Sequence, residues 1–139
     1  MRGAMESQMS SGRAFVFPGQ GSQSVGMGLE LYDVSPAARE IFKESDDSLG
    51  IRLSDMIFRG SASDLQQTVN SQPAIMTVSI ACWKAWQECL GSEAEIPVAL
   101  AGHSLGEYTS MVVAGVGVLG PSKSFLGPSA FRPPLISTV

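Results

Sequence analysis

The sequence has few cationic residues, few cysteines and a single histidine. Nine lysines and arginines stand against 13 acidic residues, which gives a formal net charge of −4. Without a basic cluster the chain lacks the surface that nucleic-acid binding requires, so we expect no nucleic-acid partner. The net charge does not exclude an anionic substrate, because one buried arginine can hold a carboxylate whatever the net charge of the protein.

Long apolar runs are also missing. No segment approaches the roughly 18 apolar residues of a membrane span, so we expect no membrane association. The first 12 residues are polar and lack the apolar stretch of a secretory signal, which favours a disordered leader over 1–12. With 139 residues, 44% of them hydrophobic, the chain has room for one modest domain with a core.

The two cysteines are too far apart to pair if they share one helix. Cys82 and Cys89 would then lie about 10 Å apart at ~1.5 Å rise per residue, whereas a disulfide needs Cα atoms within ~7 Å. We expect two reduced thiols that pack as small core side chains. Such thiols indicate a reducing compartment, and we predict a cytoplasmic location.

β-type and helical segments alternate along the chain. We predict strands at 13–17 and 97–101, helices capped by Ser35, Ser61 and Ser71, and a helix over 107–114 that ends at Gly115. The unbroken apolar run at 97–101 is typical of a parallel strand covered on both faces. This order predicts an α/β fold. Repeated proline and glycine predict an irregular tail over 120–139.

The strongest chemical signal is the segment Gly102-His103-Ser104-Leu105-Gly106. It has the pattern G-x-S-x-G between a predicted buried strand and a predicted helix, which is the context of a nucleophile elbow. Only small residues fit two positions either side of the serine, because the turn brings backbone segments together. The turn places the Ser104 hydroxyl at a helix N-terminus, where the Leu105 N–H can stabilise an oxyanion.

A second glycine-flanked loop, Pro18 to Gln23, follows the first predicted strand. In α/β proteins, ligands bind at the carboxyl ends of the strands. The loop is either an ordinary turn or the source of a second oxyanion donor, the Gln20 N–H. It lacks the lysine of a P-loop.

Three motifs together resemble the malonyl-CoA:acyl-carrier-protein transacylases. Their order and spacing match over about 13–115: Phe15-Val16-Phe17-Pro18-Gly19-Gln20-Gly21-Ser22-Gln23, then Ser71-Gln72-Pro73-Ala74, then Gly102-His103-Ser104-Leu105-Gly106-Glu107-Tyr108. The resemblance implies that residues 13–119 form the N-terminal part of an α/β-hydrolase-like large subdomain, with the small ferredoxin-like subdomain absent.

The resemblance also assigns roles. Ser104 would attack the thioester of malonyl-CoA, and the N–H groups of Gln20 and Leu105 would bind the oxyanion. Gln72 would line the substrate pocket, with His103 packing or bonding beside it. The malonyl group would pass to the phosphopantetheine thiol of acyl carrier protein, in fatty-acid biosynthesis. No permanently bound cofactor and no metal are implied.

Two residues that the family needs do not appear. The family uses a histidine well downstream of the serine as general base and an arginine that binds the malonyl carboxylate. His103 is the single histidine, and its place next to Ser104 is poorly suited to taking the serine proton. Arg132 does not match the arginine motif. We therefore expect a truncated chain that is inactive alone.

Other functions remain open on the sequence. A polyketide-type acyltransferase with a different acyl preference would share these motifs, and the deciding arginine lies beyond the match. A catalytically dead fragment that keeps only partner contacts is the non-enzymatic alternative. A lipase or esterase also uses G-x-S-x-G, but the Gln20 loop replaces the His-Gly-Gly type of oxyanion loop.

Overall fold

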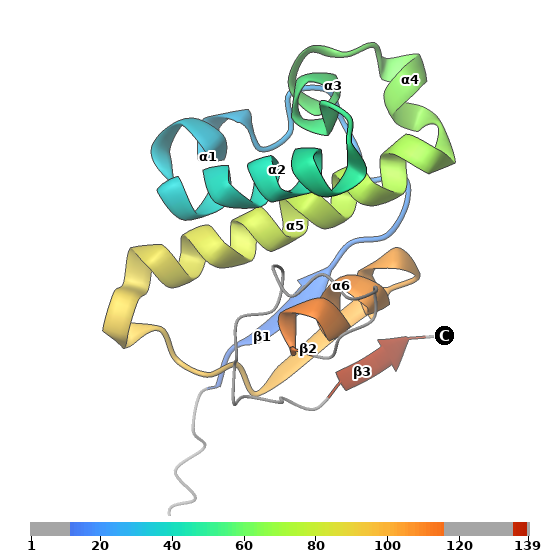
Figure 1. Cartoon of the computed structure of the whole chain (residues 1–139). Helices are drawn as coiled ribbons and strands as arrows, with labels where there is room; N and C mark the ends of the chain where they lie inside the picture. Colours follow the sequence, from blue (N-terminus) through green and yellow to red (C-terminus); the bar gives the residue numbers. More distant parts are fainter. Residues whose placement is uncertain (1–11, 116–134, 139) are drawn as a thin grey trace, which may run out of the picture.

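The computed structural model describes residues 12–115 and 135–138. The predicted leader over 1–12 lies almost entirely outside the described residues, as does most of the predicted irregular tail. The elements in chain order are β1 (Ala14–Phe17), α1 (Leu29–Val34), α2 (Pro36–Leu49), α3 (Leu53–Arg59), α4 (Ala62–Gln66), α5 (Thr68–Leu90), the 3-10 turn η1 (Gly91–Glu93), β2 (Ala99–His103), α6 (Leu105–Val113) and β3 (Leu135–Thr138) (Figure 1).

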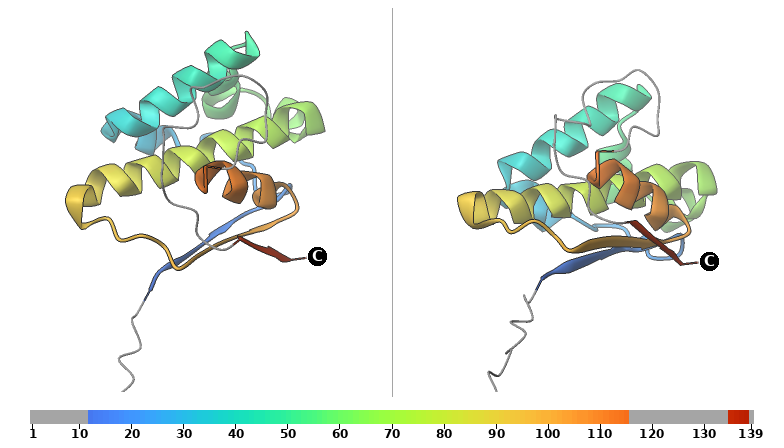
Figure 2. Two further views of the ribbon diagram at one scale, coloured as in Figure 1. Left: turned by 60° about the horizontal axis from the view of Figure 1, so that its bottom comes forward. Right: turned by 90° about the horizontal axis from the view of Figure 1, so that it is seen from below.

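The described elements are arranged around a three-stranded parallel sheet. Its strand order is β1-β2-β3, with Phe17 paired to Gly102 and Gly102 paired to Ser137. Helices α5 and α6 lie on one side of the sheet, and α1 to α4 pack against the outer side of α5 (Figures 1 and 2). The predicted α/β class is confirmed.

Two expectations about the strands need correction. Within the described residues, helices cover only one face of the sheet, and on the other face Val16 is 74% exposed. The apolar run before Ser104 therefore reflects burial of Leu100 on one face, with small alanines opposite. The expected irregular tail does not hold for 135–138, which pair with β2 as a strand. This segment follows two prolines, and its β-branched residues suit a strand.

The main core lies between α2, α3 and α5. Phe42, Leu53 and Ile57 are almost fully buried there, and Phe42 makes ring contacts with Tyr32 and Phe58. Between sheet and helix, the Phe15 ring meets the rings of Trp83 and Trp86 edge-on, at centroid distances of 4.8 and 4.7 Å. The tryptophans thus fasten α5 to β1.

Helix caps explain where several helices begin. The Ser35 hydroxyl accepts a hydrogen bond from the Ala38 N–H, and the Ser61 hydroxyl accepts one from the Asp64 N–H, which confirms both predicted caps. The predicted cap at Ser71 is wrong, because α5 begins three residues earlier, at Thr68. Pro73 therefore lies inside the helix, where proline removes one backbone hydrogen bond.

Both cysteines are free, but neither is a core residue, contrary to expectation: Cys82 and Cys89 are exposed. Partial burial of its thiol still raises the pKa of Cys82, which disfavours the reactive thiolate. None of the helices in the described part of the chain has the length and apolarity to cross a bilayer.

The one-sided sheet predicts opposite effects for neighbouring residues of β1. In the 139-residue chain, Val16→Thr should change the free energy of unfolding by no more than about 0.5 kcal/mol, because the side chain is exposed. Phe17→Thr should cost at least about 1.5–3 kcal/mol, because Phe17 is 5% exposed. Urea denaturation followed by tryptophan fluorescence measures both. Equal losses in the two variants would contradict the described packing.

Candidate active site

Ser104 occupies a strained turn between β2 and α6. Its backbone angles are φ 53° and ψ −113°, and among the described residues it is the one non-glycine residue with positive φ. Such a conformation is costly for a residue with a side chain and is retained where the surrounding structure enforces it. Ser104 is the N-cap of α6, so Leu105 is the first residue of the helix. The Leu105 N–H therefore belongs to the helix-terminal donors that have no acceptor within the helix.

The flanking glycines explain how the turn is enforced. A Cβ atom on Gly102 would overlap the backbone of Gly106, and a Cβ atom on Gly106 would overlap the carbonyl oxygen of Phe17. Both positions therefore exclude every other residue, as the motif predicts. The second contact also fixes the start of α6 against the end of β1. The Gln20 loop, which begins directly after β1, is thereby held near the serine.

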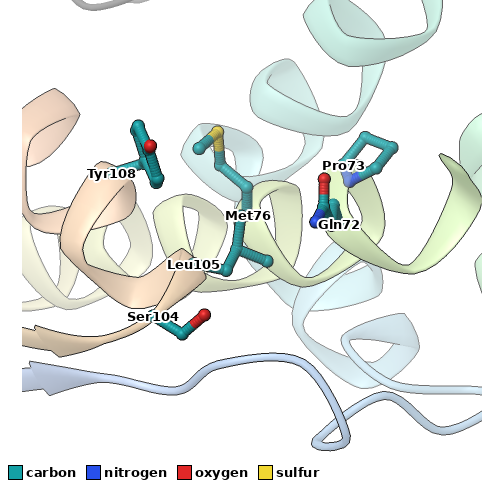
Figure 3. A pocket seen from close by; sticks show the side chains of 6 residues that line it. All are labelled: Gln72, Pro73, Met76, Ser104, Leu105 and Tyr108. Atoms are coloured by element: carbon teal, nitrogen blue, oxygen red, sulfur yellow. The ribbon is translucent and has the colours of Figure 1, made fainter. Parts of the chain in front are cut away.

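A pocket of about 430 Å³ lies beside Ser104, between α5 and α6. Gln72, Pro73 and Met76 line it from α5, and Ser104, Leu105 and Tyr108 line it from the turn and α6 (Figure 3). None of these six residues is a lysine, an arginine, a histidine or an acidic residue. The pocket can bury an acyl chain, and Gln72 and Tyr108 offer polar groups, but its described lining supplies no cation for a carboxylate.

The structure brings three predicted site residues together at this pocket: Ser104, Leu105 and Gln72. His103 is exposed and is not part of the lining. It packs against the Gln20 loop, since a Cβ atom on Gly19 would lie 2.7 Å from the His103 carbonyl oxygen and 3.1 Å from its Nδ1. The geometry thus offers His103 a contact with the loop and gives no support to a direct role in binding substrate.

Gln20 is also outside the pocket lining, and its side chain turns to α5. Its Nε2 donates to the Thr68 hydroxyl at 3.0 Å and to the Ser71 hydroxyl at 3.3 Å. Sequence reasoning missed Thr68, and it misread Ser71 as a cap. Their partner is about 50 residues away in the chain, and no local pattern reveals such a contact.

Sequence reasoning also missed three lining residues, Pro73, Met76 and Tyr108. Helical spacing could have found two of them. Met76 lies four residues after Gln72, and Tyr108 lies four residues after Ser104, so each falls on the same helix face as its partner. The described residues include no cluster of histidine, cysteine or acidic side chains able to hold a metal ion.

Comparison with known proteins identifies the class to which this site belongs. Residues 14–124 match the acyl transferase domain family, so the chain is a member of that family.

The relatives of this chain are named for transfer of a malonyl group to or from acyl carrier protein. The chain is 50% identical over 102 residues to a malonyl CoA-acyl carrier protein transacylase of Bacillus subtilis, covering 73% of this chain and 31% of that protein. It is 37% identical over 100 residues to the mitochondrial transacylase of Mus musculus, covering 72% and 26%. A solved acyl carrier protein S-malonyltransferase of Vibrio cholerae shares 44% identity at a TM-score of 0.70, covering 76% and 33%.

One further solved relative is a malonyl-transacylase in complex with a type II polyketide acyl-carrier protein. It shares 42% identity at a TM-score of 0.70, with 76% of this chain and 33% of that chain covered. The chain thus spans about a quarter to a third of the length of these relatives. These comparisons confirm the predicted family resemblance.

The glycine contacts predict a large cost for the smallest possible substitution. Gly106→Ala should destabilise the chain by more than Gly21→Ala, because the new methyl group meets the Phe17 carbonyl. At Gly21, with φ +103° and no atom within 4 Å, alanine should cost only the strain of about 1–3 kcal/mol. Chemical denaturation of both variants gives the comparison. If Gly106→Ala costs less than Gly21→Ala, the described contact between α6 and β1 is wrong.

Proposed function

We propose that this chain supplies the serine nucleophile for transfer of a malonyl group from coenzyme A to the phosphopantetheine thiol of acyl carrier protein, in fatty-acid biosynthesis. The observation that carries the proposal is the strained turn at Ser104, which opens onto the pocket between α5 and α6. The names of the relatives supply the acyl group and the carrier. In this proposal the reaction is cytoplasmic and uses no permanently bound cofactor.

The reaction divides into two transfers at Ser104. Its Oγ attacks the thioester carbon, and the N–H groups of Leu105 and Gln20 stabilise the resulting oxyanion. When the C–S bond breaks, coenzyme A leaves as the thiol after gaining a proton, and the malonyl group stays as an ester of Ser104. The carrier thiol then attacks this ester, its proton returns to Ser104 Oγ, and malonyl-carrier leaves.

The base that takes the Ser104 proton is, in this proposal, not among these 139 residues. The single histidine, His103, packs against the Gln20 loop, outside the pocket lining. The cation for the malonyl carboxylate is likewise not among the lining residues. We propose that 13–119 form the N-terminal part of the large subdomain, and that further polypeptide supplies both groups.

A polyketide-type acyltransferase is the second candidate. The specific observation in its favour is the solved relative that is bound to a type II polyketide carrier. That relative is named a malonyl-transacylase, so it supports a polyketide carrier and not a different acyl group. The two candidates share the Ser104 chemistry and differ in the acyl group or carrier that they accept.

The nucleophile assignment predicts a covalent intermediate. In a hybrid that joins residues 1–115 to the remaining C-terminal part of the Bacillus subtilis relative, malonyl-CoA should acylate Ser104, and Ser104→Ala should abolish the label. Ser92→Ala, an exposed serine in η1, is the control and should label normally. Intact-protein mass spectrometry detects the adduct.

Labelling that survives Ser104→Ala would refute the nucleophile. Stronger labelling by methylmalonyl-CoA than by malonyl-CoA would favour the polyketide-type candidate.

The missing base predicts the behaviour of the 139-residue chain by itself. Loss of the base in a serine enzyme lowers the rate by about 10⁴–10⁶-fold. Purified chain should therefore transfer malonyl groups to acyl carrier protein at background rate in a radiolabel assay. Turnover of about 1 s⁻¹ or faster, the lower end of ordinary enzyme rates, would show that these residues contain the base. Carrier binding without turnover would be the behaviour of an inactive partner-binding fragment.

A further inference from the structure

The Gln20 side chain connects the Gln20 loop, Pro18 to Gln23, to the start of α5. Both hydrogens of its terminal amide have acceptors, since Nε2 donates to Thr68 at 3.0 Å and to Ser71 at 3.3 Å. These hydroxyls lie three residues apart, so they fall on one face of the helix. The amide of one loop residue thus spans the first turn of α5.

The two hydroxyls differ in burial, so their hydrogen bonds to Gln20 should contribute unequally to holding the loop in place. Ser71 is fully buried, with 0% exposure, so a buried hydroxyl would lose its contact with Gln20 if the loop moved away. Thr68 is exposed, so water can replace its contact with Gln20. The Ser71 contact should therefore contribute more to holding the loop in place.

The helix that holds the loop also lines the pocket. Gln72 and Met76 of α5 line it, directly beyond Ser71 in the same helix. The opposite end of the same loop is fixed, because Phe17 lies against Gly106 at the start of α6. Both ends of the stretch from Phe17 to Gln20 are thus anchored to the helices that form the pocket.

We propose that Thr68 and Ser71 are positioning residues that set the Gln20 peptide N–H at the oxyanion, through the Gln20 side chain. The inference rests on the proposed function, in which that N–H is one of two oxyanion donors. Its consequence is specific: the side chain of Gln20 acts on the rate of acyl transfer without touching substrate. A shift of about 1 Å in such a group can cost on the order of 10²-fold in rate.

The first test measures the loop directly in the 139-residue chain. In ¹H–¹⁵N spectra, Thr68→Val and Ser71→Ala should each shift the backbone amide signal of Gln20. Val69→Ala is the matched control, since this neighbouring residue of α5 is 75% exposed and should leave that signal unchanged. An unmoved Gln20 signal in both hydroxyl variants would overturn the proposal.

The second test measures acylation of the hybrid enzyme by malonyl-CoA. Ser71→Ala should lower kcat about tenfold or more with little change in KM, because an oxyanion donor acts in the transition state. Thr68→Val should have a smaller effect of the same kind, and Thr68→Ser, which keeps the hydroxyl, should restore the rate. Melting temperatures of the variants identify any general loss of structure.

A double-mutant cycle separates positioning from a merely structural role. Gln20→Met keeps the peptide N–H and removes the amide, so it should slow acylation about as much as the double variant of Thr68 and Ser71. In the Gln20→Met background, Ser71→Ala should cost no further rate. Additive losses would overturn the proposal. Failure of the parent hybrid to acylate Ser104 would instead count against the proposed function, whereas an active parent with unaffected variants would refute only the positioning role.

Discussion

The structure depends on one close backbone contact, where Gly106 at the start of α6 meets the carbonyl of Phe17 at the end of β1. Parallel pairing brings Phe17 beside Gly102, and the glycine contact then presses the following helix onto the same point. Because no side chain fits between these backbones, the turn cannot relax, and Ser104 is held at positive φ. The exposed hydroxyl, the helix N-terminus and the loop after β1 are all placed by this contact.

Helix α5 contacts the chain on both sides of Phe17, at Phe15 and at Gln20. The rings of Trp83 and Trp86 hold Phe15 of β1, and at the other end of the helix the hydroxyls of Thr68 and Ser71 hold the Gln20 side chain. One long helix thus contacts the strand before the loop and the loop itself. The pocket lies along the same helix, so α5 both lines the pocket and contacts the residue that carries the proposed oxyanion donor.

Sequence patterns predicted the features that depend on contacts between residues close together in the chain. Ser35 and Ser61 cap helices because their side chains bond to backbone three residues on, and Ser104 was recognisable from the glycines around it. The expected cap at Ser71 failed because α5 begins earlier, at Thr68, and the Ser71 hydroxyl accepts a hydrogen bond from Gln20, far away in the chain. Among the described residues, the covering of one face of the sheet by helices was equally hidden, since a short apolar run does not reveal which of its faces is buried.

The pairing of β1 with β2 has a consequence for the order in which the chain folds. Ala14 is paired with Ala99, and helices α1 to α5 all lie between them. Helical contacts between near neighbours form quickly, whereas closing so long a loop is slow because of its entropic cost. The helical layer should therefore assemble before the sheet. During synthesis from the ribosome, the turn at Ser104 would then be among the last described features to take shape, after α5 has already formed one wall of its pocket.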